Sequence, residues 1–169
     1  MSKVVKGNTI PQVEVSAKGE VLLQNGKVSY GSWSSNSLTG KVRMVQHIAG
    51  RSSAKGINEA LVEALKKANL PQDSYQTTTI VNIKDAIFGT SPIVCMTVEM
   101  GKKEFPWTSV VIDAKGTVQK AWGLEKESSA VTVLDQSGNV LFFRDGKLLE
   151  SEVKEVVNLI EESLAGAIA

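Results

Sequence analysis

The sequence predicts an α/β fold with one central mixed sheet that carries helices on both faces. Strongly apolar or β-branched strands are expected at residues 42–48 and 77–83, and a helical pattern follows each of them. Turn signals between short apolar runs near both ends of the chain indicate antiparallel hairpins. Strands that alternate with helices and finish in hairpins predict a sheet with parallel and antiparallel neighbours.

The N-terminal third predicts two or three short strands joined by tight turns. Ala-Lys-Gly at residues 17–19 separates the first apolar pair from the second, and Asn-Gly at residues 25–26 separates the second from the third. Asn-Gly is a strong hairpin signal because both residues tolerate positive φ. An irregular linker rich in Ser and Asn is expected at residues 32–39.

The first helix is expected at residues 54–69, directly after the strand at residues 42–48. Ser52 or Ser53 would cap its start, and Pro71 would prevent it from continuing. One apolar stripe supports this helix. Its members are Ile57, Leu61, Leu65 and Ala68.

Two further helices are expected in the second half of the chain. Ser91 and Pro92 are typical of the N-cap and first helical position, so residues 93–104 are interpreted as a helix, although their valines leave a strand as an alternative. Ser151 is expected to cap the last helix. The apolar face of that helix consists of Val153, Val156, Val157, Ile160 and Leu164.

Two similar units, at residues 110–118 and 132–140, complete the predicted sheet. Each contains an apolar strand, an Asp-x-x-Gly turn and a second apolar run, so both are expected to be hairpins. From residue 41 onward the predicted order contains the βαβ and ββα units of thioredoxin, with hairpin strands added.

The composition is that of an ordinary globular protein, expected to form a single domain over residues 1–169 with its core at about 7–165. Of its 169 residues, 42% are hydrophobic and 22% charged. Nineteen basic and 18 acidic residues give a net charge of +1 without a basic cluster, which argues against nucleic-acid binding. No apolar run reaches the roughly 20 residues needed to cross a membrane.

The single cysteine, Cys95, excludes an intramolecular disulfide, a Cys-x-x-Cys motif and a multi-cysteine zinc site. Because it lies in an apolar run, a buried thiol that packs as a small hydrophobe is the favoured interpretation. The alternative is a peroxidatic or mixed-disulfide thiol, which would need exposure and a lowered pKa. With only one histidine, no metal site is expected, and no cofactor is predicted.

The loop after the strand at residues 42–48 is the candidate functional segment. Gly50, Arg51, Ser52 and Ser53 combine backbone N–H groups at a helix start, two hydroxyls and a guanidinium, which would suit a small anion. The alternative is a helix cap beside a surface arginine. Ser52 could act as a nucleophile only with a general base, and His47 is the one histidine available.

His47 also has a simpler interpretation, as a hydrogen-bonding residue at the end of a strand. The three tryptophans are expected to be mainly core residues. Trp122 precedes a glycine and a charged run, so it is expected to lie nearest the surface.

Several unusual segments resemble the YtfJ family of bacterial periplasmic proteins, which are thioredoxin-like in fold and poorly defined in function. The strings GKVRMVQHIAGRSSAKGIN at residues 40–58 and YQTTTIVN at residues 75–82 carry this resemblance, together with Phe-Pro-Trp at residues 105–107 and the stretch 121–135. The resemblance implies export to the periplasm after cleavage of a signal sequence.

A more distant similarity to thiol-disulfide oxidoreductases implies where redox residues would lie. It places Ser52 near the nucleophilic cysteine, Lys55 near the resolving cysteine and Ser129 near the cis-proline. Since these hallmarks are absent, the resemblance implies a non-redox binding or accessory protein rather than an enzyme. Its partner would be an unknown protein or a small anionic ligand held near Arg51 and Ser129. The alternative is a single-cysteine redox or peroxidase-like enzyme that uses Cys95.

Overall fold

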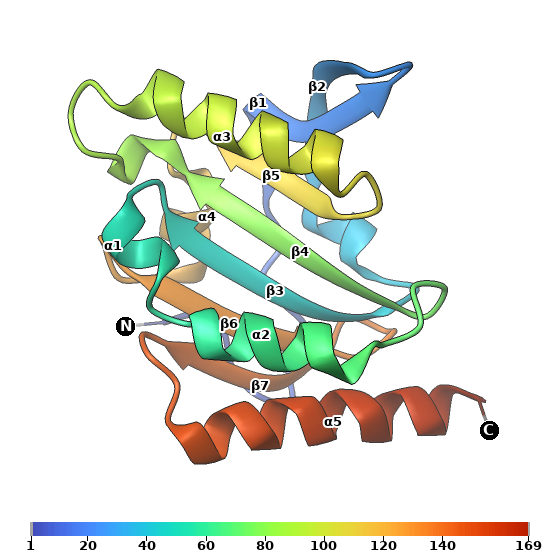
Figure 1. Ribbon diagram of the computed structural model, residues 1–169. Coiled ribbons are helices and arrows are strands. Elements are labelled where there is room, and N and C mark those ends of the chain that lie inside the picture. The colour runs from blue at the N-terminus through green and yellow to red at the C-terminus, as the bar shows by residue number, and fades with distance from the viewer. Residues whose placement is uncertain (1, 169) are drawn as a thin grey trace.

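The computed structural model describes residues 2–168, with side chains up to residue 166, as a seven-stranded mixed sheet covered by helices on both faces (Figure 1). The strand order is β2-β1-β5-β4-β3-β6-β7, and only the pairs β3–β4 and β4–β5 are parallel. The strands are β1 (Glu14–Gln24), β2 (Lys27–Ser34), β3 (Val42–Ala49), β4 (Tyr75–Asn82), β5 (Ser109–Asp113), β6 (Ser129–Leu134) and β7 (Val140–Asp145). The predicted α/β fold class is confirmed.

The helices form two unequal layers. In Figure 1, α2, α3 and α5 lie across the front of the sheet, whereas α4 lies behind it. The α-helices are α1 (Ser52–Lys55), α2 (Glu59–Ala68), α3 (Ser91–Glu104), α4 (Thr117–Trp122) and α5 (Glu150–Ile168), and the 3-10 helices are η1 (Ser35–Leu38) and η2 (Ile83–Asp85).

The N-terminal hairpin is confirmed at Asn25 and Gly26, whose φ angles of 51° and 78° let the chain reverse between β1 and β2. The turn expected at residues 17–19 is instead a bulge inside one long strand, β1. Gly19 has φ 90°, and a Cβ there would lie 2.1 Å from the carbonyl oxygen of Gly31, so this close approach of two strands requires glycine.

The expected linker at residues 32–39 is more regular than predicted. Ser32 to Ser34 finish β2, and η1 follows directly. The Ser34 hydroxyl accepts a hydrogen bond from the backbone N–H of Asn36 at 3.2 Å, so serine caps this short helix instead of leaving the segment irregular.

The single helix expected at residues 54–69 is interrupted. Gly56 ends α1, and Asn58 precedes α2 with its side chain buried. The Asn58 amide donates to the carbonyl of Gly146 at 3.0 Å and accepts from the backbone N–H of Leu148 at 2.9 Å. These bonds to the segment before α5 favour a break at this point over one continuous helix.

The first of the two predicted hairpins is wrong, and the second is confirmed. After β5 the chain forms α4, and the Asp113 carboxylate supports its start by accepting from the backbone N–H groups of Val118 at 2.8 Å and Lys115 at 3.3 Å. In the second unit, Asp135 accepts from the N–H of Asn139 at 2.9 Å, and β6 pairs with β7.

The predicted starts of α3 and α5 are shifted. The segment after Ser91 is a helix and not a strand, but Thr90 occupies the N-cap position. At α5 the expected cap, Ser151, is already helical, and the Glu152 carboxylate instead accepts from the backbone N–H of Leu149 at 2.8 Å. A carboxylate that reaches back in this way satisfies the same N–H groups that a serine cap would serve.

The sheet separates two main apolar clusters. The cluster on the α4 side centres on Trp122, which is 1% exposed, so the expectation that it borders the surface is wrong. The cluster under α2 and α5 includes Leu61 and Ile160, both fully buried, and a small third cluster lies under α3. Trp107 is the exposed tryptophan, at 54%.

Candidate functional site

The predicted strand-to-helix junction forms where β3 ends. The backbone N–H of Gly50 donates to the carbonyl of Asn82 at 2.9 Å, and a Cβ on Gly50 would lie 3.2 Å from that same oxygen. Close backbone packing therefore favours a small residue here. Ser52 and Ser53 are exposed at the start of α1, and Arg51 occupies the N-cap, so the prediction that a serine caps this helix is wrong.

Arg51 does not face solvent or an anion as expected. Its guanidinium forms ion pairs with Glu127 at 3.0 Å and with Asp85 at 3.5 Å, and its Nε donates to the carbonyl of Asp85 at 2.9 Å. The side chain is only 18% exposed. The guanidinium that the anion interpretation required is thus already neutralised, and it ties the junction to the loops after β4 and before β6.

Ser129 lies close to this junction in the sheet but is not accessible to a ligand. It begins β6, pairs with Ile48 of β3 and has no exposed surface. Its hydroxyl accepts a hydrogen bond from the Asn58 amide at 3.3 Å. Ser129 therefore lies beside the strand that leads into the junction, and its side chain has a packing role.

His47 is buried on the α4 side of β3, next to Ile80 and Ala130 in the neighbouring strands. Burial lowers its pKa to about 4. Within residues 2–168 its Nε2 has no hydrogen-bond partner, and no hydrogen bond joins it to Ser52. The described residues therefore provide no nucleophile and base pair at the junction, and the hydrogen bond expected of His47 is not made at Nε2.

Cys95 lies in α3, on the face that packs against the sheet. It is 8% exposed and contacts the small cluster that contains Val21 and Ile112. Burial raises the pKa of its thiol, which is the opposite of what a reactive thiolate needs.

Native Cys95 is therefore expected to react with a maleimide at least about tenfold more slowly at pH 7 than the same cysteine in urea-unfolded protein. The rate can be followed by mass spectrometry of the single adduct. Equal rates for native and unfolded protein would contradict burial and indicate an activated thiol.

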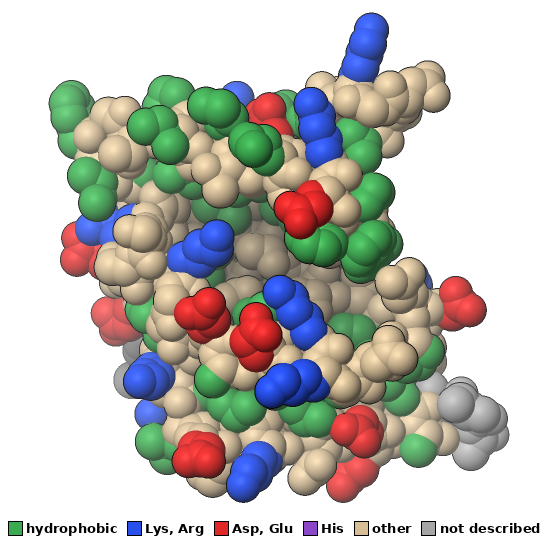
Figure 2. Space-filling model, viewed as in Figure 1, with side chains coloured by type: hydrophobic (Ala, Val, Ile, Leu, Met, Phe, Trp, Pro, Cys, Tyr) green, Lys and Arg blue, Asp and Glu red, His purple; other side chains and the backbone are tan. Residues whose placement is uncertain are grey.

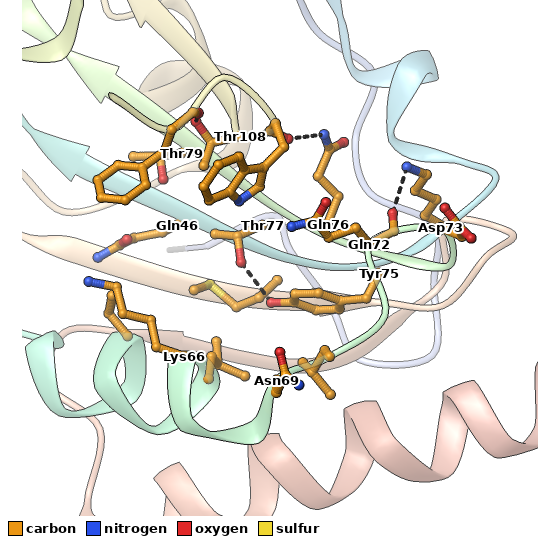
Figure 3. A pocket seen from close by; sticks show the side chains of 17 residues that line it. Gln46, Lys66, Asn69, Gln72, Asp73, Tyr75, Gln76, Thr77, Thr79 and Thr108 are labelled. Atoms are coloured by element: carbon orange, nitrogen blue, oxygen red, sulfur yellow. Dashed lines mark hydrogen bonds between the residues drawn. The ribbon is translucent and has the colours of Figure 1, made fainter. Parts of the chain in front are cut away.

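A groove between α2 and α3 was not predicted. It measures about 680 Å³ and lies over the centre and lower ends of β3 and β4, where Figure 2 shows a hollow between the two helices. Figure 3 shows the close arrangement of its side chains. The groove is lined by Lys41, Met44, Gln46, Val62, Leu65, Lys66, Asn69, Leu70, Gln72, Asp73, Tyr75, Gln76, Thr77, Thr79, Phe105, Trp107 and Thr108.

The floor of this groove is polar although it belongs to interior strands. Tyr75, Thr77 and Thr79 alternate along one face of β4, and Gln46 lies on the same face of β3. The opposite end of the same β4 face carries Val81, which is buried. The alternation of polar residues at positions 75, 77 and 79 is the one sequence signal that could have indicated this groove.

The described part of the chain contains no group of three or more His, Cys, Asp or Glu side chains placed to hold a metal ion. None of its helices combines the length and the apolar character required to cross a membrane.

Comparison with known proteins identifies relatives over nearly the whole chain. A family model described as a bacterial protein of unknown function, YtfJ_HI0045, matches residues 4–163. An uncharacterised protein YtfJ of Escherichia coli is 46% identical over 158 residues, covering 94% of this chain and 86% of the relative. An uncharacterised protein of Haemophilus influenzae is 41% identical over 152 residues, covering 90% and 83%.

Solved structures support the fold. The thioredoxin domain of a thiol-disulfide oxidoreductase from Bacteroides vulgatus is similar with a TM-score of 0.57 at 13% identity, covering 92% of this chain and 97% of that domain. At such low identity the likeness shows a shared thioredoxin-like fold alone.

Proposed function

Because this chain belongs to the YtfJ family of bacterial proteins, whose function is unknown, we propose that it is a thioredoxin-like binding or accessory protein that does not exchange disulfides. The fold is shared with oxidoreductases, but a fold does not by itself confer their chemistry. The main observation in support of the proposal is the burial of the thiol: Cys95, the one cysteine, is buried in α3.

Disulfide exchange needs an accessible thiolate and a second sulfur that resolves the mixed disulfide. The exposed start of α1, which the distant similarity aligns with the redox motif, carries Ser52 and Lys55. The competing function, a single-cysteine redox or peroxidase-like enzyme, would have to use Cys95 despite its burial and raised pKa.

The protein is expected to reduce insulin with dithiothreitol no faster than buffer does, because its one thiol, Cys95, is buried and not accessible to the substrate. Turbidity at pH 7 measures the rate, with a thioredoxin as positive control and Cys95→Ala as the matched variant. A rate well above buffer that disappears in Cys95→Ala would refute the proposal and support the single-cysteine enzyme.

The family resemblance also supports a proposed location in the periplasm. Fractionation of bacterial cells that express the natural gene tests this location. The protein would appear in the osmotic-shock fraction, and recovery in the cytoplasmic fraction alone would contradict the location.

A further inference from the structure

We propose that the groove between α2 and α3 binds a neutral saccharide of one or two rings, a ligand assignment that rests on the proposed binding function. A volume of about 680 Å³ is within the usual range for small-molecule sites. The chemistry of the floor, the walls and the rim determines which class of molecule the groove suits.

The floor offers hydrogen-bonding groups that the protein itself does not use. Gln46 is only 7% exposed, and within residues 2–168 neither its side-chain amide nor the hydroxyl of Thr79 has a hydrogen-bond partner. The Thr77 and Tyr75 hydroxyls form a hydrogen bond at 2.8 Å, which leaves one O–H free to donate and acceptor capacity at both oxygens. These partly buried polar groups can exchange hydrogen bonds with ligand hydroxyls, which an apolar ligand could not do.

The loop after α3 supplies aromatic surface beside this floor. Phe105 and Trp107 are 40% and 54% exposed and pack edge to face with centroids 5.5 Å apart. The main chain of this loop is fixed from two sides: Gln76 donates to the carbonyl of Trp107 at 3.2 Å, and Lys102 donates to the carbonyl of Pro106 at 2.8 Å. A large, anchored ring next to hydroxyl and amide groups suits the apolar face and polar edge of a sugar ring.

The charges of the groove lie at its rim. Lys66 extends from α2 and is paired with Glu63 at 3.7 Å, and Lys41 donates to the carbonyl of Gln72 at 3.0 Å. Asp73 lies at the end near β4 (Figure 3). The residues of the floor are uncharged, so a strongly charged ligand would lose its hydration there without a compensating ion pair.

An extended peptide fits the groove less well than a saccharide does. Peptides that add to a sheet require a strand edge with unpaired backbone groups. Both strands under the groove are interior, because β3 pairs with β4 and β6, and β4 pairs with β3 and β5. The floor therefore presents side chains only, which matches a compact polyhydroxylated molecule.

The test is an NMR titration of the intact chain with glucose, maltose, cellobiose and N,N′-diacetylchitobiose, and with tetra-alanine as a peptide probe. At least one of the saccharides is expected to shift the Gln46 side-chain amide and the Trp107 indole resonances saturably. Gln46→Ala and, separately, the nearly isosteric Thr79→Val should each weaken binding about tenfold or more, which corresponds to about 1.4 kcal/mol.

Gln136→Ala, which changes an exposed glutamine outside the groove, should bind as the unchanged protein does. Circular dichroism of each variant verifies folding, and Thr79→Val keeps the test decisive if Gln46→Ala is unstable. The absence of a saturable shift with any saccharide, or saturable binding of tetra-alanine alone, would overturn the proposal. The insulin assay does not depend on the groove. Failure of saccharide binding therefore leaves the non-redox function standing, and the two proposals can be refuted independently.

Discussion

Replacing Trp122 with alanine is expected to lower the free energy of unfolding by about 3–5 kcal/mol. The indole is 1% exposed within the apolar cluster on the α4 side of the sheet, and its Nε1 donates to the carbonyl of Pro11 at 2.9 Å. The substitution leaves a large cavity and removes one of the hydrogen bonds that hold the N-terminal segment. Urea unfolding followed by far-UV circular dichroism at 25 °C measures the change.

Two variants show which property of Trp122 matters. Trp122→Phe keeps most of the apolar volume and leaves the Pro11 carbonyl without its donor, so a smaller loss of about 1–3 kcal/mol is expected. Trp107→Ala removes a half-exposed tryptophan from the surface and should cost less than about 1 kcal/mol. Equal losses for Trp122→Ala and Trp107→Ala would contradict the assignment of Trp122 to the core.

The stability of the protein is expected to fall as the pH drops from about 6.5 to about 4, in part because of His47. Burial lowers the pKa of this imidazole from 6.5 to about 4, an effect larger than the opposing influence of the Asp113 and Asp85 carboxylates. The unfolded chain therefore takes up a proton in this range while the folded protein does not. The lost stability amounts to roughly 3 kcal/mol between these limits.

The contribution of His47 is isolated by comparing the protein with His47→Gln, which cannot titrate. The free energies of unfolding of the two proteins are measured by urea titration at pH 4, 5, 6 and 7. Plotted against pH, the two sets of values should have different slopes. The unchanged protein should lose roughly 3 kcal/mol more than the variant between pH 7 and pH 4, with little difference in slope above pH 7. Parallel curves for the two proteins would show that the imidazole is solvated in the native state.

Most elements with a strong periodic signal were predicted correctly, and the errors fall where a distant residue decides the outcome. The strands β3 and β4 and the hairpin at Asn25 follow from local pattern. The break between α1 and α2 depends on Asn58, whose partners lie near Gly146 and Leu148, far along the chain. Local propensity contains no information about such bonds.

The Asp-x-x-Gly motif illustrates the same limit. At Asp135 it produces a hairpin, and at Asp113 it produces a helix start, although the local residues are nearly alike. In each case the carboxylate satisfies backbone N–H groups that follow it. The next element is determined by what packs on the sheet, and Val118 is fully buried in the α4-side cluster.

The strand-to-helix junction lies where the sequence placed it, but its charge pairing was not predicted. The junction and the proximity of Ser129 followed from the sequence, whereas the carboxylates that neutralise Arg51 come from Asp85 and Glu127 in two other loops. The groove is a product of the spacing between α2 and α3. A sequence pattern can indicate its polar floor but not the distance between the helices that leaves it open.

The position of β3 in the sheet also sets the order in which the molecule can assemble. Its neighbour β6 is synthesised long after β4, so a nascent chain that ends before Ser129 contains an apolar strand with one edge unpaired. Such fragments are prone to associate with one another. The sheet can close only after β6 and β7 have been synthesised, and pairing between strands so far apart in the chain is the kind of contact that slows folding.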